Sequence, residues 1–259
     1  NATSFNQPLG SWDISIAENM SWMFAHTTSF NQSIQEWDVS SVIDITGMFY
    51  EASSFNQPLG KWDVSSVSTM DSLFYGASLF NQDLRFWDIS NVHSISHFLT
   101  DTTLSTLNYD NLLIHWAQLR LQSDLQFDGG NAKYSGKAVS GRDFLKDYFN
   151  WTISDNGLRP LPIPNALMVE TSDQRVFLSW EDSNTQDWFD VEYYYIFRTV
   201  NLSESFEFLT MTPYTNFTDV SVENRKTYYY KIKMASDYDK SSFSETVSAT
   251  PLSVTDDSD

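Results

Sequence analysis

The sequence predicts two structural classes in succession: an α+β repeat solenoid with a C-terminal cap, then an all-β sandwich. Three observations support this prediction. A 25-residue pattern recurs four times from residue 2, apolar residues change to alternating spacing near residue 165, and a proline-rich segment lies between the two patterns. A chain of 259 residues has room for about two domains.

The repeat is defined by four segments that align without a gap, starting at Ala2, Thr27, Ala52 and Ala77. Each contains Phe-Asn-Gln and then Trp-Asp, a β-branched residue and Ser. We expect a short strand around each Trp, with the Trp inside and the Asp outside, because side chains alternate along a strand. The apolar residues that follow are spaced as in one or two helical turns. A single repeat cannot bury its own apolar face, so the four should stack on one continuous core.

Two residue types that recur in phase are expected to hold the stack together. The tryptophans should fill the core, and the asparagines should satisfy backbone groups of the loops. These structural residues are Trp12, Trp37, Trp62, Trp87, Asn6, Asn31, Asn56 and Asn81.

The repeat resembles that of the BspA-type bacterial surface leucine-rich-repeat family, F-N-Q-x-L-x-x-W-D-V-S-x-V-x-x-M-x-x-M-F. The resemblance runs from residue 2 to about 157. It implies a leucine-rich-repeat-like solenoid over 1–101 and a solenoid cap over 102–157. It also implies a protein that is secreted or anchored at a cell surface and that acts in adhesion.

In the cap, the sequence predicts two helices, over 109–117 and 141–149, and a closing strand over 151–153. Its role would be to cover the apolar face of the last repeat. Because residue 1 falls just before a repeat begins, we expect the chain to be a fragment of a larger protein.

A second domain is predicted after residues 158–164, whose three prolines indicate a stiff, extended linker. Alternating apolar residues such as Val176-x-Leu178-x-Trp180 then predict half-buried strands. Residues 165–252 resemble a fibronectin type III domain, in which Trp180 takes the place of the core tryptophan and Tyr228 that of the tyrosine corner. The resemblance implies an immunoglobulin-like sandwich that acts as a spacer. Residues 253–259 are expected to be an acidic tail or linker.

The charge of the chain excludes one class of partner. The net charge is −19, with 8 basic and 17 acidic residues in 1–162 and 7 and 17 in 163–259. A nucleic-acid binder needs a basic surface to displace counterions from phosphate, so no nucleic-acid partner is expected. No apolar run is long enough to span a bilayer, so direct membrane insertion is not expected either. There is no cysteine, which excludes disulfides and thiolate sites.

One Asp per repeat is expected on the exposed side of each strand, where stacked like charges repel one another. Calcium at Asp38 and Asp63 would offset that repulsion, because calcium takes carboxylate oxygens. The alternative is that each Asp accepts hydrogen bonds from nearby Ser hydroxyls and turn N–H groups. Apart from calcium, no cofactor is expected.

The sequence contains no nucleophile elbow, phosphate loop or dinucleotide fingerprint, so we expect no enzymatic activity. Stacked repeats bind through variable side chains on a constant frame. The candidates are the residue before each Trp, the exposed Asp and nearby aromatic residues, which either stack on sugar rings or pack between repeats. The ligand-binding candidates are Asp13, Asp38, Asp63, Asp88, Glu36, Lys61, Phe86, Trp22, Tyr50 and Tyr75.

These features together predict a non-catalytic binding or adhesion module, secreted or at the cell surface and favoured as a monomer. Its expected partner is a cell-surface or matrix protein or a polysaccharide. The alternatives are a structural spacer and a targeting appendage of a larger, secreted polysaccharide-active enzyme.

Overall fold

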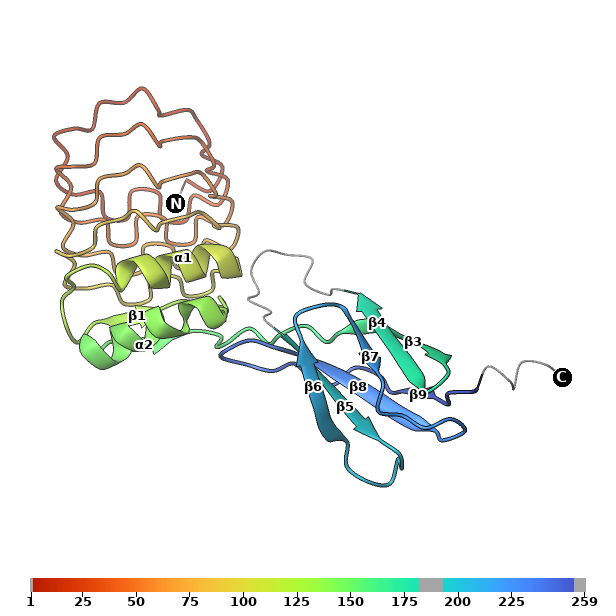
Figure 1. Cartoon of the computed structure of the whole chain (residues 1–259). Helices are drawn as coiled ribbons and strands as arrows, with labels where there is room; N and C mark the ends of the chain where they lie inside the picture. Colours follow the sequence, from red (N-terminus) through yellow and green to blue (C-terminus); the bar gives the residue numbers. More distant parts are fainter. Residues whose placement is uncertain (1, 182–192, 254–259) are drawn as a thin grey trace. The chain divides into compact units, whose positions relative to one another are not determined.

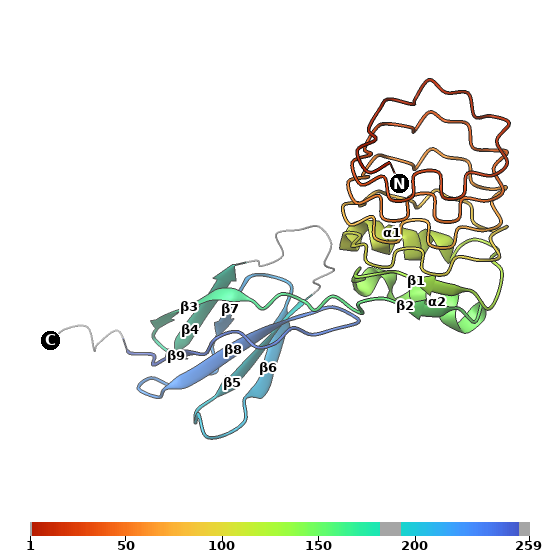
Figure 2. The same ribbon diagram turned by 180° about the vertical axis from the view of Figure 1, so that it is seen from behind.

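The computed structural model describes residues 2–181 and 193–253. The chain divides into two compact units, residues 1–159 and residues 160–259 (Figures 1 and 2). Residues 254–259, most of the expected acidic tail, lie outside the described residues.

The predicted α+β, leucine-rich-repeat-like solenoid class is wrong. Residues 2–101 contain neither a helix nor a strand longer than a single bridge. The α-helices in the described residues are two short ones after the repeats, α1 (Thr106–Trp116) and α2 (Val139–Tyr148), and most strands lie in the second unit. The physical reason is that many backbone hydrogen bonds of these residues join neighbouring coils rather than residues of one helix. In a helix each N–H bonds four residues back, whereas here Gly47 N–H donates to Asp71 O at 2.8 Å and Phe49 N–H to Leu73 O at 3.0 Å.

Residues 2–101 instead form four tight-turned coils, called here the coil stack (Figure 2). Single parallel bridges join neighbouring coils at equivalent positions: Asn19 to Asp44, Asp44 to Thr69, and Thr69 to Ser94. Val42, Ile45, Met48 and Phe49 are all buried, so the spacing that suggested a helix reflects turns around a common core.

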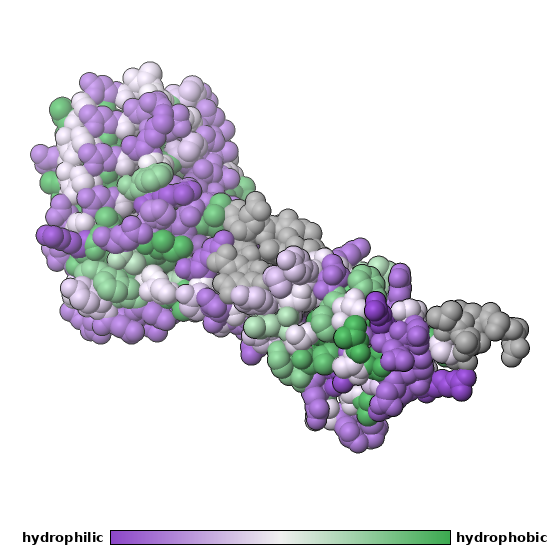
Figure 3. Space-filling model, in the orientation of Figure 1, coloured by the Kyte–Doolittle hydropathy of each residue, from purple (hydrophilic) through white to green (hydrophobic). Residues whose placement is uncertain are grey.

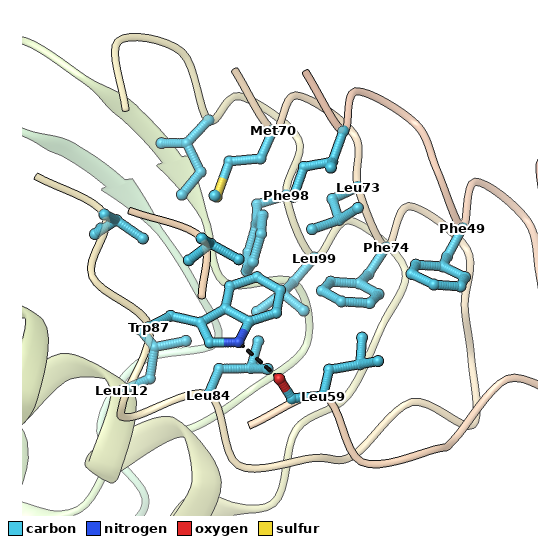
Figure 4. Packing of buried hydrophobic residues seen from close by; sticks show 14 of the residues in the cluster. Phe49, Leu59, Met70, Leu73, Phe74, Leu84, Trp87, Phe98, Leu99 and Leu112 are labelled. Atoms are coloured by element: carbon cyan, nitrogen blue, oxygen red, sulfur yellow. Dashed lines mark hydrogen bonds between the residues drawn. The ribbon is translucent and has the colours of Figure 1, made fainter. Parts of the chain in front are cut away.

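The core of the coil stack is built from columns of rings (Figure 4). Phe30 and Phe55 stack at 5.9 Å between centroids, and Phe49 and Phe55 at 4.0 Å. Each inner Trp also donates its indole N–H to a carbonyl of the preceding coil, as Trp87 does to Leu59 O at 3.0 Å. The core is therefore tied from coil to coil by a buried hydrogen bond as well as by ring packing.

Trp12 departs from this pattern, and its expected inward packing is wrong. It is 54% exposed, whereas Trp37 is 4% exposed. The indole of Trp37 donates to Leu9 O at 3.0 Å in the coil before it. Among the described residues no coil precedes Trp12, so its indole lacks both that acceptor and a covering layer.

The recurring asparagines form a ladder along one edge of the stack. Asn6 Oδ1 accepts from the Asn31 backbone N–H at 2.9 Å and from Gln32 Nε2 at 3.0 Å. The same pair of bonds recurs at the next two junctions, and Ser105 N–H ends the ladder at Asn81 Oδ1. The amide side chains thus satisfy loop N–H groups that would otherwise lack partners.

The segment after the repeats covers the last coil. Helix α1 begins at the N-cap Ser105, and the short strands β1 (Gln126–Asp128) and β2 (Thr152–Ser154) pair in parallel. Between them lie η1 (Gly136–Ala138) and α2. Trp116 of α1 packs on Phe98 of the last coil at 5.9 Å.

The second unit is a two-sheet antiparallel sandwich (Figure 1). One sheet has the order β3-β4-β7 and the other the order β6-β5-β8-β9. The strands are β3 (Asn165–Ser172), β4 (Arg175–Glu181), β5 (Tyr193–Thr199), β6 (Glu207–Thr212), β7 (Asn216–Asp219), β8 (Tyr228–Ala235) and β9 (Val247–Ala249).

Its core follows the alternation read from the sequence. Val176, Leu178 and Trp180 of β4 are buried, and Trp180 meets Tyr194 edge to face at 5.2 Å. The Tyr228 hydroxyl accepts the Glu223 backbone N–H at 2.9 Å, which is the bond of a tyrosine corner. The fibronectin type III-like character of this unit is confirmed.

Candidate binding face of the coil stack

Two positions in every coil have left-handed backbone, and they define one face of the coil stack. The first position is occupied by Trp22, Gly47, Ser72 and His97, with φ between 55° and 60°. The second is occupied by His26, Glu51, Gly76 and Asp101, with φ between 53° and 66°. This conformation suits glycine and is unfavourable for a bulky side chain. Trp22 therefore stands at a position that the next coil fills with glycine.

Trp22, Tyr50 and Tyr75, here called the aromatic row, join ring to ring on this face. The Trp22 and Tyr50 centroids are 5.5 Å apart at an angle of 54°, and Tyr50 stacks on Tyr75 at 4.7 Å and 13°. The Trp22 ring lies against Gly47, where an added Cβ would come within 2.5 Å of it. Trp22 is 51% exposed and both tyrosines are partly exposed.

Polar groups border the aromatic row. His26 Nδ1 lies 2.8 Å from Glu51 Oε2, and the His26 ring meets Tyr50 edge to face at 5.3 Å. Partial burial, together with the nearby charges of Glu51 and Asp101, raises the pKa of Tyr50. A tyrosine hydroxyl is protonated at neutral pH even without such a shift, so that of Tyr50 can donate a hydrogen bond.

The four Asp that follow the tryptophans are exposed, and each is held by a Ser two residues on. Ser hydroxyls donate to Oδ1 of Asp13, Asp38 and Asp63 at 2.6–2.7 Å, and Asp88 Oδ1 accepts Ser90 N–H at 3.0 Å. The Ser side-chain bonds come first among the causes that lower the pKa of Asp13, Asp38 and Asp63. The described residues contain no group of three or more His, Asp or Glu that could hold a metal ion. Hydrogen bonds from Ser to the Asp carboxylates are thus present, as the alternative to calcium expects.

The residues before the tryptophans engage other partners. Lys61 Nζ lies 3.1 Å from Glu36 Oε1, and both side chains are about two-thirds exposed. Phe86 is 75% exposed, with the Arg85 guanidinium 5.5 Å from its ring centroid. In the described residues, no ring contact, ion pair or hydrogen bond links these three candidates to the aromatic row.

Sequence reasoning missed His26, Glu51 and Asp101, which share this face with His97. The repeat alignment did contain a signal for these two left-handed positions. Both columns contain glycine in one coil and larger residues in the others, which marks a left-handed position. His97 also lines a small hollow of about 110 Å³, whose other lining residues are Ser96, Gln126, Phe127, Asp128, Thr152 and Ser154.

Comparison with known proteins gives partial matches. The family described as "Mycoplasma protein of unknown function, DUF285" matches residues 1–112 and lends no support to the leucine-rich-repeat resemblance. No curated protein is detectably similar. In the described residues, no helix has the length and apolar character needed to cross a membrane.

Solved structures match parts of the chain. A β-1,2-glucanase from Parabacteroides distasonis is 22% identical, with a TM-score of 0.30 over 36% of this chain and 12% of the glucanase. A fibronectin type III domain of human fibronectin type III domain containing protein 3 is 15% identical, with a TM-score of 0.34 over 39% of this chain and 94% of that domain. The twitchin kinase region from C. elegans is 19% identical, with a TM-score of 0.33 over 36% of this chain and 17% of that one. The strand order and the tyrosine corner identify the C-terminal unit as a fibronectin type III-like sandwich.

Proposed function

We propose that the chain is a non-catalytic binding or adhesion module, secreted or displayed at a cell surface, and that the aromatic row binds a neutral polysaccharide. One observation carries this proposal. Trp22 is half exposed on left-handed backbone, over a glycine and in ring contact with Tyr50. Strain of this kind costs on the order of 1–3 kcal/mol and gathers at functional sites.

The frame beneath the row supports a binding role for these rings. Phenylalanine columns, indole hydrogen bonds and the asparagine ladder already join the coils. The aromatic row adds little to that core, because its tryptophan keeps half of its surface in water. Trp and Tyr are among the residues most enriched in the energetic hot spots of protein–protein interfaces.

The charge around the row points to an uncharged ligand. Glu51 and Asp101 are exposed beside the rings, and the whole chain carries −19. Carboxylates accept hydrogen bonds from sugar hydroxyls and repel anionic groups. Aromatic rings offer an apolar surface to the C–H face of a sugar. A neutral polysaccharide satisfies both conditions, and the sandwich would then act as the spacer of the module.

The test is retention of the intact chain on insoluble neutral polysaccharides, followed by titration with soluble fragments of any that bind. Trp22→Ala and Tyr75→Ala should each weaken binding by about 10- to 100-fold, as loss of an aromatic anchor does. Tyr214→Ala is the matched control, because Tyr214 is 69% exposed in the other unit. Equal binding by all three variants, or no binding by a folded wild-type chain, would favour the structural-spacer alternative.

A further inference from the structure

A second surface, on the sandwich, differs in character from the acidic chain around it. The outward sides of three adjacent strands carry an apolar row, an aromatic row and a lysine row. We call these residues the amphipathic sheet face: Phe208 and Met211 of β6, Tyr195 and Phe197 of β5, and Lys231 and Lys233 of β8. Figure 3 shows hydrophobic side chains (green) gathered on the surface of the sandwich.

Strand register places these residues in two parallel lines across the sheet. Phe197 pairs with Phe208 on one side and with Lys231 on the other. Tyr195 likewise pairs with Met211 and with Lys233. Paired residues of antiparallel strands point to the same face. Each line therefore runs from an apolar side chain through a ring to a lysine.

The apolar row is open to solvent. Phe208 is 55% exposed and Met211 is 53% exposed. Phe208 touches Tyr195 and Phe197 edge to face at 5.6 and 5.7 Å, which fixes its ring against the sheet. A rigid, exposed apolar row of this kind is suited to bury the side chains of a partner.

The lysine row, together with Lys240 from the segment after β8, lies over aromatic rings. Lys233 Nζ is 4.1 Å and Lys231 Nζ 5.5 Å from the centroid of Phe243, and Lys240 Nζ is 4.8 Å from that of Tyr195. Within the described residues, no carboxylate forms an ion pair with these three lysines. In a chain with 34 acidic and 15 basic residues, three such lysines on one face form a local cationic site.

The geometry points to one kind of occupant: we propose that the amphipathic sheet face binds an acidic amphipathic α-helix of a partner protein. Neighbouring strands lie about 4.8 Å apart, so the apolar row of β6 and the lysine row of β8 are about 10 Å apart. That distance matches the diameter of an α-helix with its side chains, about 10–12 Å. A helix that lies along the strands presents an apolar stripe and a charged stripe side by side, whereas an extended peptide presents a single row of side chains to the sheet.

The test uses the intact chain and a synthetic helical peptide with a leucine stripe beside a glutamate stripe. Titration calorimetry at low salt should show binding that weakens at high salt, because exposed ion pairs are screened. Lys231→Gln with Lys233→Gln, and separately Phe208→Ser with Met211→Ser, should each weaken binding by about tenfold. The control variants are Lys226→Gln and Leu202→Ser, an exposed lysine and an exposed leucine off this face.

Two further peptides make the outcome decisive. A scrambled peptide of the same composition, and a peptide with lysine in place of glutamate, should both bind at least tenfold more weakly by the same reasoning. Hydrogen exchange of the unaltered chain should show protection in β5, β6 and β8 when the designed peptide is added, independently of any variant. Equal binding of the scrambled peptide, equal binding of the basic peptide, no binding, or protection elsewhere would each overturn the proposal. Equal binding of dextran sulfate would also overturn it, in favour of a general polyanion site.

Discussion

Replacing Trp62 with phenylalanine tests how the coils are held together. The Trp62 indole is 3% exposed and donates to Ile34 O at 3.1 Å. Ile34 O also accepts the Trp37 backbone N–H, so it keeps one partner after the substitution. The lost hydrogen bond should cost about 1 kcal/mol. The gap left by the smaller ring should cost about 1 kcal/mol more, so the free energy of unfolding should fall by about 2 kcal/mol.

Trp12→Phe provides the matched comparison, because Trp12 occupies the same repeat position but is 54% exposed. Its cost should stay within about 0.5 kcal/mol, as for surface substitutions. Differential scanning calorimetry of the full chain is the assay, since two units can unfold in separate transitions. Equal destabilisation by the two substitutions would refute the conclusion that the buried indole ties the coils together.

Three other predictions concern the aromatic row, the sandwich and the Asp of the coil stack. Gly47→Ala should lower the free energy of unfolding by about 1 kcal/mol, because φ at Gly47 is positive. The added Cβ should also displace the Trp22 ring and so move its indole N–H resonance in NMR spectra. An unmoved resonance would contradict the packing of Trp22 on Gly47. Burial opposes ionisation of Asp219, but hydrogen bonds from Ser221 and Arg198 still lower its pKa. Above a pH of about 4, the ordinary pKa of a carboxylate, ionised Asp219 should therefore stabilise the sandwich fully. That stabilisation should be lost as the pH falls below about 4 and through the lower pKa that Asp219 has in the folded state. An acid titration of unfolding should show a shallower loss for Asp219→Asn, and an unchanged slope would argue against this role. The melting temperature should be the same with calcium and with chelator, because Ser groups already hold the exposed Asp; a rise with calcium would reveal a bound ion.

The sequence predicted the strands of the sandwich well and the turns of the coils poorly. Val176, Leu178 and Trp180 fall at every second position, which is the spacing of a half-buried strand. By contrast, Val42, Ile45 and Met48 fit a helix and a series of inward-facing turns equally well. Only the partners of the backbone N–H groups distinguish the two, and those partners lie one coil away.

The candidate face could be predicted in part. Its aromatic residues were visible as variable positions of the repeat, but their grouping depends on which coil positions share a side. The contact between His26 and Glu51, which are 25 residues apart, joins two positions that both have left-handed backbone. Positive φ at a residue other than glycine leaves little trace in a single sequence. Here the only sequence signal of left-handed backbone was that glycine occupies each of these positions in one repeat and larger residues occupy it in the others.

A glycan-array screen of the intact chain beside Trp22→Ala tests the central claim most directly. The proposed function predicts selective binding of neutral glycans by the wild-type chain, with the signal lost in the variant and kept in Tyr214→Ala. Binding that is equal in all three proteins, or that favours anionic glycans, would contradict a binding site at the aromatic row.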